Sequence, residues 1–285
     1  MSDVPRQALD RVTTTLRGFT PRRIRARFDG PRVLANSVPK SGTNLLTQCL
    51  SLFPMLRPSF KHVSMNQNRD ASSSEFERKV GKTGRGQYTS AHVFHTEANA
   101  EILEANDITA LLIVRDPRDV VTSHYHYVTE KNPSHRFHEY YNSLDDDRDR
   151  LLASIRGVSG EQSADEKPLE SIGEWMDSFL GWMDKEYNQV VRFEDLIGPR
   201  GGGDKESQVE TVRTIAAHLD VELAEEEVQY VADNTFSTDS STFRKGLIGD
   251  WENNFDPEHV AAFKDEAGDW LVELGYEDDL DWTAE

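Results

Sequence analysis

The chain alternates short apolar runs with longer stretches in which apolar residues recur at helical spacing. The runs 32–38, 88–94, 108–114 and 189–193 are short and apolar, which is typical of buried strands. Helical spacing is found over 44–53, 96–106, 171–186, 206–219, 224–232 and 257–274, and another helix is expected to start at Asp119. Because strands and helices alternate, the pattern predicts an α/β domain with a central, mainly parallel sheet flanked by helices.

Polar segments without a clear period separate these elements. Residues 64–87 are rich in Ser, Gly, Arg and Lys, so we predict a mobile loop or lid there. Residues 134–160 are expected to be helical but irregular, and 198–203 and 238–254 to be connections. We therefore divide the chain into a basic N-terminal segment, residues 1–30, and one α/β domain, residues 31–285.

The net charge of the chain indicates which kinds of binding partner are to be expected. Its 285 residues include 32 Lys and Arg against 51 Asp and Glu, a formal net charge of −19. Sequence-independent nucleic-acid binding depends on cations that neutralise phosphates, so we expect no nucleic-acid partner. One hypothesis for the acidity is adaptation to a high-salt, halophilic cytoplasm, where self-repulsion is screened; an ordinary acidic protein is the alternative.

Other features of the sequence bear on where the protein acts. The apolar runs are too short to span a membrane, and the N-terminus lacks the apolar core of a signal peptide. Cys49 is the single cysteine, so an internal disulfide is impossible and a cytoplasmic location is expected. The arginines between positions 22 and 27 predict either weak peripheral contact with anionic lipid or a solvated arm against the acidic body. The oligomeric state is not specified by these patterns.

The segment Val38–Leu45 lies between a predicted strand and a predicted helix. A helix N-terminus offers backbone N–H groups to a phosphate, and Gly42 allows close approach of the backbone. Ser41 and Thr43 add hydroxyl groups and Lys40 adds a full charge. The segment does not match the nucleotide loop G-x-x-x-x-G-K-S/T, because Lys40 precedes the glycine. A helix that simply starts after a turn is the alternative interpretation.

Two further segments carry cations. Arg115 follows a strand, can contact a phosphate through two N–H groups, and has Ser123 within the first two turns of the next helix. The alternative for Arg115 is a structural ion pair with Asp116 or Asp119. The third segment, Phe243–Trp251, contains adjacent cations next to a glycine, and a solvated charged turn is the alternative there. In parallel sheets ligands bind at the carboxyl ends of strands, where the first two segments are expected.

Together, and in this order, the three segments resemble the sulfotransferases that use 3′-phosphoadenosine 5′-phosphosulfate (PAPS). Pro39–Thr43 resembles the family's 5′-phosphosulfate loop, and Arg115–Ser123 its 3′-phosphate segment. Arg244–Gly246 with Gly249–Trp251 resembles its C-terminal phosphate-contacting motif. Phe193–Asp195 is a weaker match to a Tyr-Glu-Asp sequence that often follows a strand. The resemblance covers residues 32–255 and implies a fold like that of P-loop nucleotide kinases.

The resemblance implies PAPS as donor and a set of binding residues. Lys40 would stabilise the leaving phosphate, and the backbone of Ser41, Gly42, Thr43 and Asn44 would hold the 5′-phosphate. The 3′-phosphate would be bound by residues of the second and third segments, namely Arg115, Ser123, Arg244, Lys245 and Gly246. Sulfuryl transfer needs positioning and charge neutralisation more than covalent catalysis, and this scheme requires no metal.

The acceptor must lose a proton, and the family's base is typically a histidine at a strand end. His92 stands at that place, and an imidazole can accept a proton from an alcohol near neutral pH. A structural, hydrogen-bonded histidine is the alternative. His95 is the nearest rival, but on an extended strand it would project to the opposite face. His124 and His126 are expected to be packing or surface residues.

The sequence departs from the family pattern at several positions. Ser90 stands where a lysine is common, and Glu252 where a lysine frequently follows Asp-Trp. Leu45 replaces an aromatic residue that stacks on adenine in many members, so Phe236 is expected to contact the adenine instead.

The sequence thus predicts a PAPS-dependent sulfotransferase that acts on a hydroxyl or amine of a small-molecule, lipid or sugar acceptor. The alternatives are a P-loop-type small-molecule kinase and a non-catalytic module that binds phosphoadenosine phosphate. The acceptor pocket is expected to form from residues 60–68, 64–87 and 135–141, whose spacing does not name a substrate.

Overall fold

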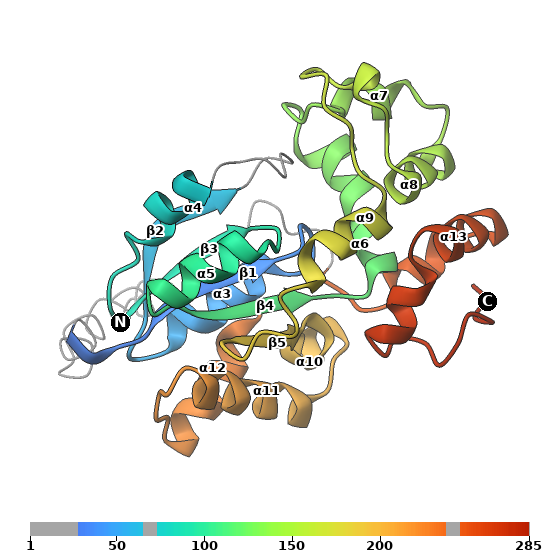
Figure 1. Cartoon of the computed structure of the whole chain (residues 1–285). Coiled ribbons are helices and arrows are strands. Elements are labelled where there is room, and N and C mark those ends of the chain that lie inside the picture. Colours follow the sequence, from blue (N-terminus) through green and yellow to red (C-terminus); the bar gives the residue numbers. More distant parts are fainter. Residues whose placement is uncertain (1–27, 65–72, 238–245, 285) are drawn as a thin grey trace, which may run out of the picture.

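The structure is a computed structural model that describes residues 28–64, 73–237 and 246–284 (Figure 1). The arginines of the basic N-terminal segment lie outside the described residues, as do Arg244 and Lys245 of the third candidate segment.

The centre of the fold is a sheet of five parallel strands in the order β2-β3-β1-β4-β5. These strands are β1 (Arg32–Ser37), β2 (Arg57–Ser64), β3 (Gln87–His92), β4 (Thr109–Val114) and β5 (Asn188–Arg192). Four of the five coincide with the predicted runs, and the predicted α/β architecture is confirmed. The exception is β2, an edge strand with Pro58 and the polar Lys61 and His62, whose composition gives little strand signal.

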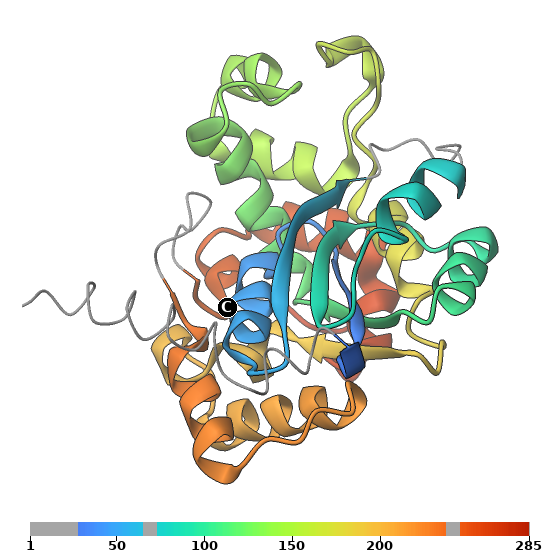
Figure 2. The same ribbon diagram turned by 90° about the vertical axis from the view of Figure 1, so that its left-hand side faces the viewer.

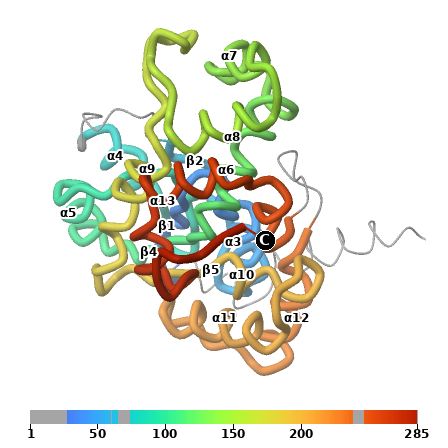
Figure 3. The backbone as a smooth tube through the Cα atoms, turned by 90° about the vertical axis from the view of Figure 1, so that its right-hand side faces the viewer, coloured from blue at the N-terminus to red at the C-terminus, as the bar shows by residue number. Residues whose placement is uncertain are grey.

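Side chains alternate between two cores along each interior strand. On β4, Ala110, Leu112 and Val114 pack on one face of the sheet, while Leu111 and Ile113 pack on the other. The helices that cover the second face include α3 (Thr43–Leu52), α11 (Lys205–His218) and α12 (Glu225–Thr235). Helices α11 and α12 lie together on that side in Figures 1 and 3. Cys49 of α3 is fully buried in this core.

The other face is covered by helices from the middle and end of the chain. They are α4 (Ser73–Val80), α5 (Glu97–Ala105), α6 (Pro117–His126), α9 (Ile172–Leu180) and α13 (Pro257–Glu273). Helix α4 lies inside the stretch predicted as a loop, so that prediction was wrong over Ser73–Val80. Helix α9 ends at Leu180, earlier than predicted, with Gly181 as its C-cap. The predicted N-cap of α5 is confirmed, since the Thr96 hydroxyl accepts a hydrogen bond of 3.1 Å from the Asn99 N–H.

The chain between α6 and α9 forms a lobe that stands apart from the sheet. A π-helical turn (Tyr127–Lys131) continues α6, and α7 (His138–Ser143) and α8 (Asp147–Arg156) follow. Figures 1 and 2 show this green and yellow lobe rising beyond the carboxyl ends of the strands. The remaining elements are α10 (Phe193–Ile197) and short 3₁₀ turns at Gly160–Gln162, Pro199–Gly201 and Asp250–Asn253.

A buried asparagine fixes the chain where β3 ends. Asn36 of β1 donates from Nδ2 to the carbonyl of Val93 and accepts from the Val93 N–H, both at 2.9 Å. The Trp182 indole donates to the same carbonyl at 2.9 Å. These bonds hold the residues that follow His92 in one position.

None of the helices within the described ranges is long and apolar enough to cross a membrane.

Candidate functional site

A cavity of about 1090 Å³ opens at the carboxyl ends of the central strands. Because β1 and β4 are paired in parallel, with Ser37 opposite Ile113, the turns that follow them share one edge of the sheet. Both turns line this cavity, and the end of β3 does so beside them. Of the predicted site residues, those that line it are Lys40, Gly42, Thr43, Asn44, His92, Arg115, Ser123, Phe236 and Gly246.

The turn after β1 depends on Gly42. This residue has φ +108° and ψ +31°, a left-handed conformation that residues with a Cβ rarely adopt. A Cβ here would lie 2.7 Å from Cδ2 of Phe193 and 3.1 Å from Cδ1 of Ile113. Helix α3 begins at the next residue with no side-chain N-cap, an arrangement that suits an anion at its N-terminus.

Ser41 differs from the other residues of this turn. It is buried, it is not among the residues that line the cavity, and its N–H donates to the Val38 carbonyl at 3.1 Å. Its hydroxyl has no hydrogen-bond partner among the described residues. Thr43 does line the cavity, and its hydroxyl lies 2.7 Å from the Ser37 hydroxyl.

Lys40 approaches the cavity from the same turn. Its Nζ lies 4.0 Å from the centre of the Tyr127 ring, in a cation–π contact with the first residue of the π-helical turn. This contact ties the β1 turn to the lobe that follows α6.

Arg115 makes the ion pair that was the alternative interpretation and also lines the cavity. One of its terminal nitrogens donates to Asp119 at 3.1 Å and to the Leu247 carbonyl at 2.7 Å. Its guanidinium lies 4.4 Å from the centre of the Phe193 ring. Its Nε is buried without a partner among the described residues, so part of the guanidinium hydrogen-bonding capacity is unused by them.

Asp119 connects the second and third candidate segments. Its side chain is fully buried and accepts hydrogen bonds of 3.0 Å from the backbone N–H groups of Gly249 and Trp251. Burial raises the pKa of this carboxyl, against the opposing effect of Arg115 and the two N–H donors. The sequence pattern suggested Asp119 as a partner of Arg115 and gave no sign of its contacts with the C-terminal loop.

Phe193 and Glu194 contact the turn after β1 and the turn after β4. The Phe193 ring lies against both Gly42 and Arg115. Glu194 accepts from the Asp116 N–H at 3.0 Å and from the Tyr276 hydroxyl at 2.9 Å. The role of these residues is therefore to position the turns, and burial raises the pKa of the Glu194 carboxyl.

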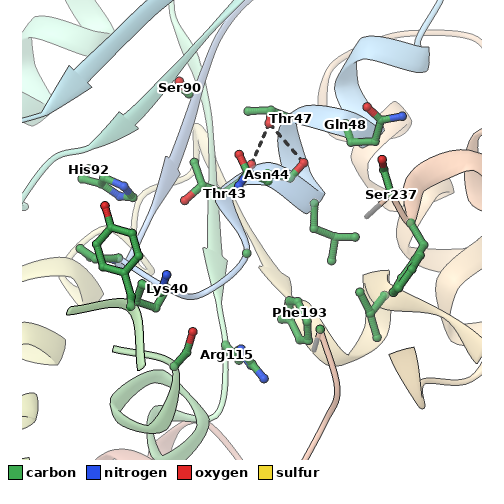
Figure 4. Close-up of a pocket in the computed structure, with 18 of the residues that line it drawn as sticks. Lys40, Thr43, Asn44, Thr47, Gln48, Ser90, His92, Arg115, Phe193 and Ser237 are labelled. Carbon is green, nitrogen blue, oxygen red and sulfur yellow. Dashed lines mark hydrogen bonds between the residues drawn. The ribbon is translucent and has the colours of Figure 1, made fainter. Parts of the chain in front are cut away.

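The hydrogen bonds of His92 define its tautomer. Its Nδ1 lies 2.9 Å from the Ser37 carbonyl, which can only accept, so Nδ1 carries the proton and Nε2 carries the lone pair. Burial lowers the pKa of His92 to about 4, and nearby His62 and Lys40 contribute in the same direction. The imidazole is thus neutral at pH 7, and Figure 4 shows it beside Lys40.

The other histidines named in the sequence lie elsewhere. His95 is not among the cavity-lining residues and packs edge-on against Trp182, with ring centres 5.0 Å apart. His124 is buried with Nδ1 3.1 Å from the Ser154 hydroxyl, and His126 lies 2.7 Å from a carboxylate oxygen of Glu130. The packing and surface roles expected for His124 and His126 are confirmed.

The opposite side of the cavity combines apolar and polar side chains. Phe236 and Leu45 line it, and Arg200 stacks on the Phe236 ring with a guanidinium-to-centre distance of 4.5 Å. Gln48 and Ser237 lie on this side in Figure 4, away from His92 and Ser90. Within the residues the structure describes, no group of three or more His, Cys, Asp or Glu side chains could hold a metal ion.

Comparison with known families identifies the chain. Its sequence matches the family described as "Sulfotransferase domain" over residues 30–275. The chain belongs to this family. The predicted resemblance is therefore confirmed at the level of the family.

Individual relatives of this sulfotransferase are distant. Sulfotransferase 6B1 of Danio rerio is 28% identical over 161 residues, which are 51% of this chain and 46% of the relative. The chain therefore spans about half the length of that relative. Sulfotransferase 6B1 of Homo sapiens is 24% identical over 243 residues, 78% of this chain and 70% of the relative.

Solved structures share the fold of this sulfotransferase. Mouse sulfotransferase SULT7A1 complexed with PAP is 18% identical, with a TM-score of 0.58, covering 86% of this chain and 88% of that one. Retinol dehydratase in complex with androsterone and the inactive cofactor PAP is 14% identical, with a TM-score of 0.54, covering 84% and 80%.

Proposed function

We propose that this sulfotransferase transfers the sulfuryl group of PAPS to a hydroxyl or amine of a small-molecule, lipid or sugar acceptor. One observation carries the proposal: Lys40 and Arg115, on turns after two paired strands, line the same cavity as a histidine with its Nε2 lone pair available. The PAP complexes of proteins that share the fold support PAPS as the donor.

The residues present fit a donor with two phosphate sites. We assign the 5′-phosphosulfate to Lys40 and the turn from Gly42 to Asn44, where the uncapped N-terminus of α3 favours an anion. We assign the 3′-phosphate to Arg115 and Ser123, with Gly246 from the third segment and, by resemblance, Arg244 and Lys245. Phe236 would contact the adenine. The unpartnered Nε of Arg115 supports this assignment, because a buried N–H group without a partner is costly.

In the proposed reaction the acceptor oxygen or nitrogen attacks sulfur in line with the bond to the 5′-phosphate. His92 accepts the acceptor proton on Nε2 as the new bond to sulfur forms. The old S–O bond breaks, its electron pair remains on the phosphate oxygen, and Lys40 stabilises that charge. The products are PAP, the sulfated acceptor and a protonated His92.

The low pKa of His92 is compatible with this role. In the protein alone, burial lowers the pKa to about 4, so the base is ready in its neutral form at pH 7. A donor carrying several negative charges beside the imidazole would raise this pKa and so strengthen the base when the donor is bound.

Thermal stabilisation by nucleotides tests the donor. We expect PAP to raise the melting temperature far more than ATP at equal concentration, because ATP has no 3′-phosphate for Arg115. Equal or greater stabilisation by ATP would contradict the proposal and favour the kinase alternative.

Substitution of His92 tests the chemistry. The variant His92→Ala should lose sulfuryl transfer by 10²- to 10⁴-fold, roughly the contribution of general base catalysis, while its PAP-induced melting shift remains. His95→Ala is the matched control, because His95 is not among the cavity-lining residues. If His92→Ala kept full activity, the base would be another group; if wild-type protein bound PAP without transfer to any acceptor, the non-catalytic alternative would stand.

A further inference from the structure

The end of the cavity beside His92 is lined largely by polar side chains, whereas the end at Phe236 combines polar side chains with apolar ones. The polar side chains at the end beside His92 come from β2, β3 and the lobe after α6, namely His62, Ser64, Ser90, Tyr127, Asn132 and His135. The apolar lining residues Phe193, Ile197 and Phe236 belong instead to the core on the α3 side of the sheet. We call the first group the polar rim.

One wall of the polar rim is formed by the edge of the sheet. Ser64 lies opposite His92 in the β2–β3 register, and His62 lies opposite Ser90. The His62 ring is 4.9 Å from the His92 ring, centre to centre, and its Nδ1 is 3.0 Å from the Ser90 hydroxyl. These side chains therefore adjoin the proposed base directly.

The other wall belongs to the lobe. The Tyr127 ring contacts Nζ of Lys40, and the Tyr127 hydroxyl accepts a hydrogen bond of 3.0 Å from Asn132 Nδ2. His135 follows, with its ring centre 6.1 Å from that of Tyr127. The two walls thus lie on either side of the Lys40–His92 pair, where the reacting group of the acceptor must lie.

These groups retain hydrogen-bonding capacity beyond the bonds they make to described residues. The Ser64 hydroxyl has no hydrogen bond to another described residue, and the Tyr127 hydroxyl, which accepts from Asn132, still has its own proton to donate. Asn132 keeps its carbonyl oxygen, and His62 keeps Nε2. The polar rim therefore presents both donors and acceptors to a molecule beside His92.

From this arrangement we propose that the acceptor is polyhydroxylated, a sugar or sugar-like polyol, and not an apolar phenol or sterol. The inference rests on the proposed function, since it concerns the acceptor of the same site. A ring with several hydroxyl groups can pair with the donors and acceptors of the polar rim when water leaves. An apolar ring would leave the donors and acceptors of the polar rim unpaired. Sites that hydrogen-bond the hydroxyl groups of a substrate strongly reject analogues that lack those hydroxyl groups.

The charge state of the polar rim agrees with an uncharged acceptor. Burial lowers the pKa of His135 to about 4, and burial also lowers the pKa of His62. Both rings are therefore neutral at pH 7. His62 Nδ1 is engaged with the Ser90 hydroxyl and His135 Nδ1 accepts from the Phe137 N–H, so each ring keeps its Nε2 for another partner. Retinol dehydratase, a structure with the same fold, was solved with androsterone, so the proposal sets this chain apart from that protein.

Competing acceptors provide the test. The full chain is incubated with PAPS and, separately, methyl glucoside, methyl galactoside, octyl glucoside, 4-nitrophenol and androsterone, and sulfated products are quantified by mass spectrometry. We expect kcat/KM for the best glycoside to exceed that for the phenol and the sterol by at least about 100-fold. Comparison of octyl with methyl glucoside distinguishes a lipid-linked sugar from a free one.

The inference would be overturned if the protein preferred 4-nitrophenol or androsterone. It would also be overturned if protein that PAP stabilises transferred the sulfuryl group to no glycoside. In both outcomes the PAP-induced melting shift shows that the donor site still binds. Failure of PAP to stabilise the chain would instead contradict the proposed function, so the two failures are distinguishable.

Variants of the lobe wall give a second readout. Asn132→Leu and His135→Phe keep side-chain size but remove hydrogen bonds, so we expect at least about 10-fold lower kcat/KM for glycosides and an unchanged PAP-induced melting shift. The matched control is Asn142→Leu, an exposed asparagine of α7 that bonds within its own helix. Glycoside transfer at the wild-type rate by both lobe variants would contradict the role of the polar rim.

Discussion

At the scale of single residues, Gly42 carries a steric demand as well as a conformational one. Its φ of +108° and the 2.7 Å approach of Phe193 both exclude a Cβ. We expect Gly42→Ala to destabilise the fold by about 1–3 kcal/mol through backbone strain, with an added cost for displacing Phe193. Because Phe193 also supports Arg115, the PAP-induced melting shift should fall as well.

A second glycine separates the two effects. Gly202 also has a positive φ, +89°, but a Cβ there would meet nothing within 4 Å. Gly202→Ala therefore introduces backbone strain alone. We expect calorimetric melting to show a smaller loss of unfolding free energy for Gly202→Ala than for Gly42→Ala. If both variants lost the same unfolding free energy, Phe193 would move away from the new Cβ at no energetic cost.

His92 makes stability depend on pH with a defined sign. Its pKa is about 4 in the folded chain and about 6.5 when unfolded, so the unfolded state binds more protons between these values. The contribution to stability is fully present above pH 6.5 and is lost as the pH falls toward 4. We expect His92→Asn, which cannot titrate, to show a shallower decline in melting temperature over that window than wild type. An identical decline would contradict the low pKa.

At the scale of elements, one carboxylate joins α6 to the C-terminal loop. Asp119→Asn keeps the shape of the side chain but replaces one accepting oxygen with an NH₂ group that faces donors from Arg115 and Gly249. We expect the change to cost about 1–3 kcal/mol and to weaken PAP binding, because the loop and Arg115 lose a shared anchor. Titration calorimetry with PAP measures this directly.

Asp265→Asn is the matched control for that experiment, since Asp265 is an exposed residue of α13. PAP affinity in Asp119→Asn equal to that of the control would show that the loop is held by other contacts.

The sequence predicted four of the five strands well because their signal is local. Strands β1 and β4 are buried on both faces, and the runs over β3 and the edge strand β5 contain apolar residues such as Tyr88 and Val191. The other edge strand, β2, and helix α4 consist largely of polar residues. Their position depends on packing of a few residues such as Val63 and Phe76, which a polar stretch does not reveal. Periodicity alone therefore could not predict them.

The residues of the candidate site that follow local sequence patterns were also predicted, and those held by contacts distant in sequence were not. Lys40 and Arg115 follow parallel strands and His92 is the last residue of another. Parallel strands end at one edge of the sheet, so a common cavity for the three residues could be expected. Asp119 and Glu194 could not be assigned their roles. They accept hydrogen bonds from backbone N–H groups 130 and 78 positions away, and backbone donors leave no trace in a sequence.

At the scale of the whole molecule, the net charge of −19 implies self-repulsion that added salt should screen. If the acidity is an adaptation to high salt, the melting temperature should rise from low to molar potassium chloride. Sucrose at matched osmolality is the control, because it stabilises by exclusion without screening charge. An unchanged melting temperature across the salt series would favour the ordinary acidic protein.

The burial of Cys49 has a practical consequence for studying this protein. The chain has one cysteine, it is fully enclosed by the core beneath α3, and burial raises its pKa to about 12. Thiol-directed dyes therefore find no reactive background in the native fold. A cysteine introduced at the exposed Ile248 would accept a fluorophore selectively, and its emission would report the arrival of the donor at the loop in real time.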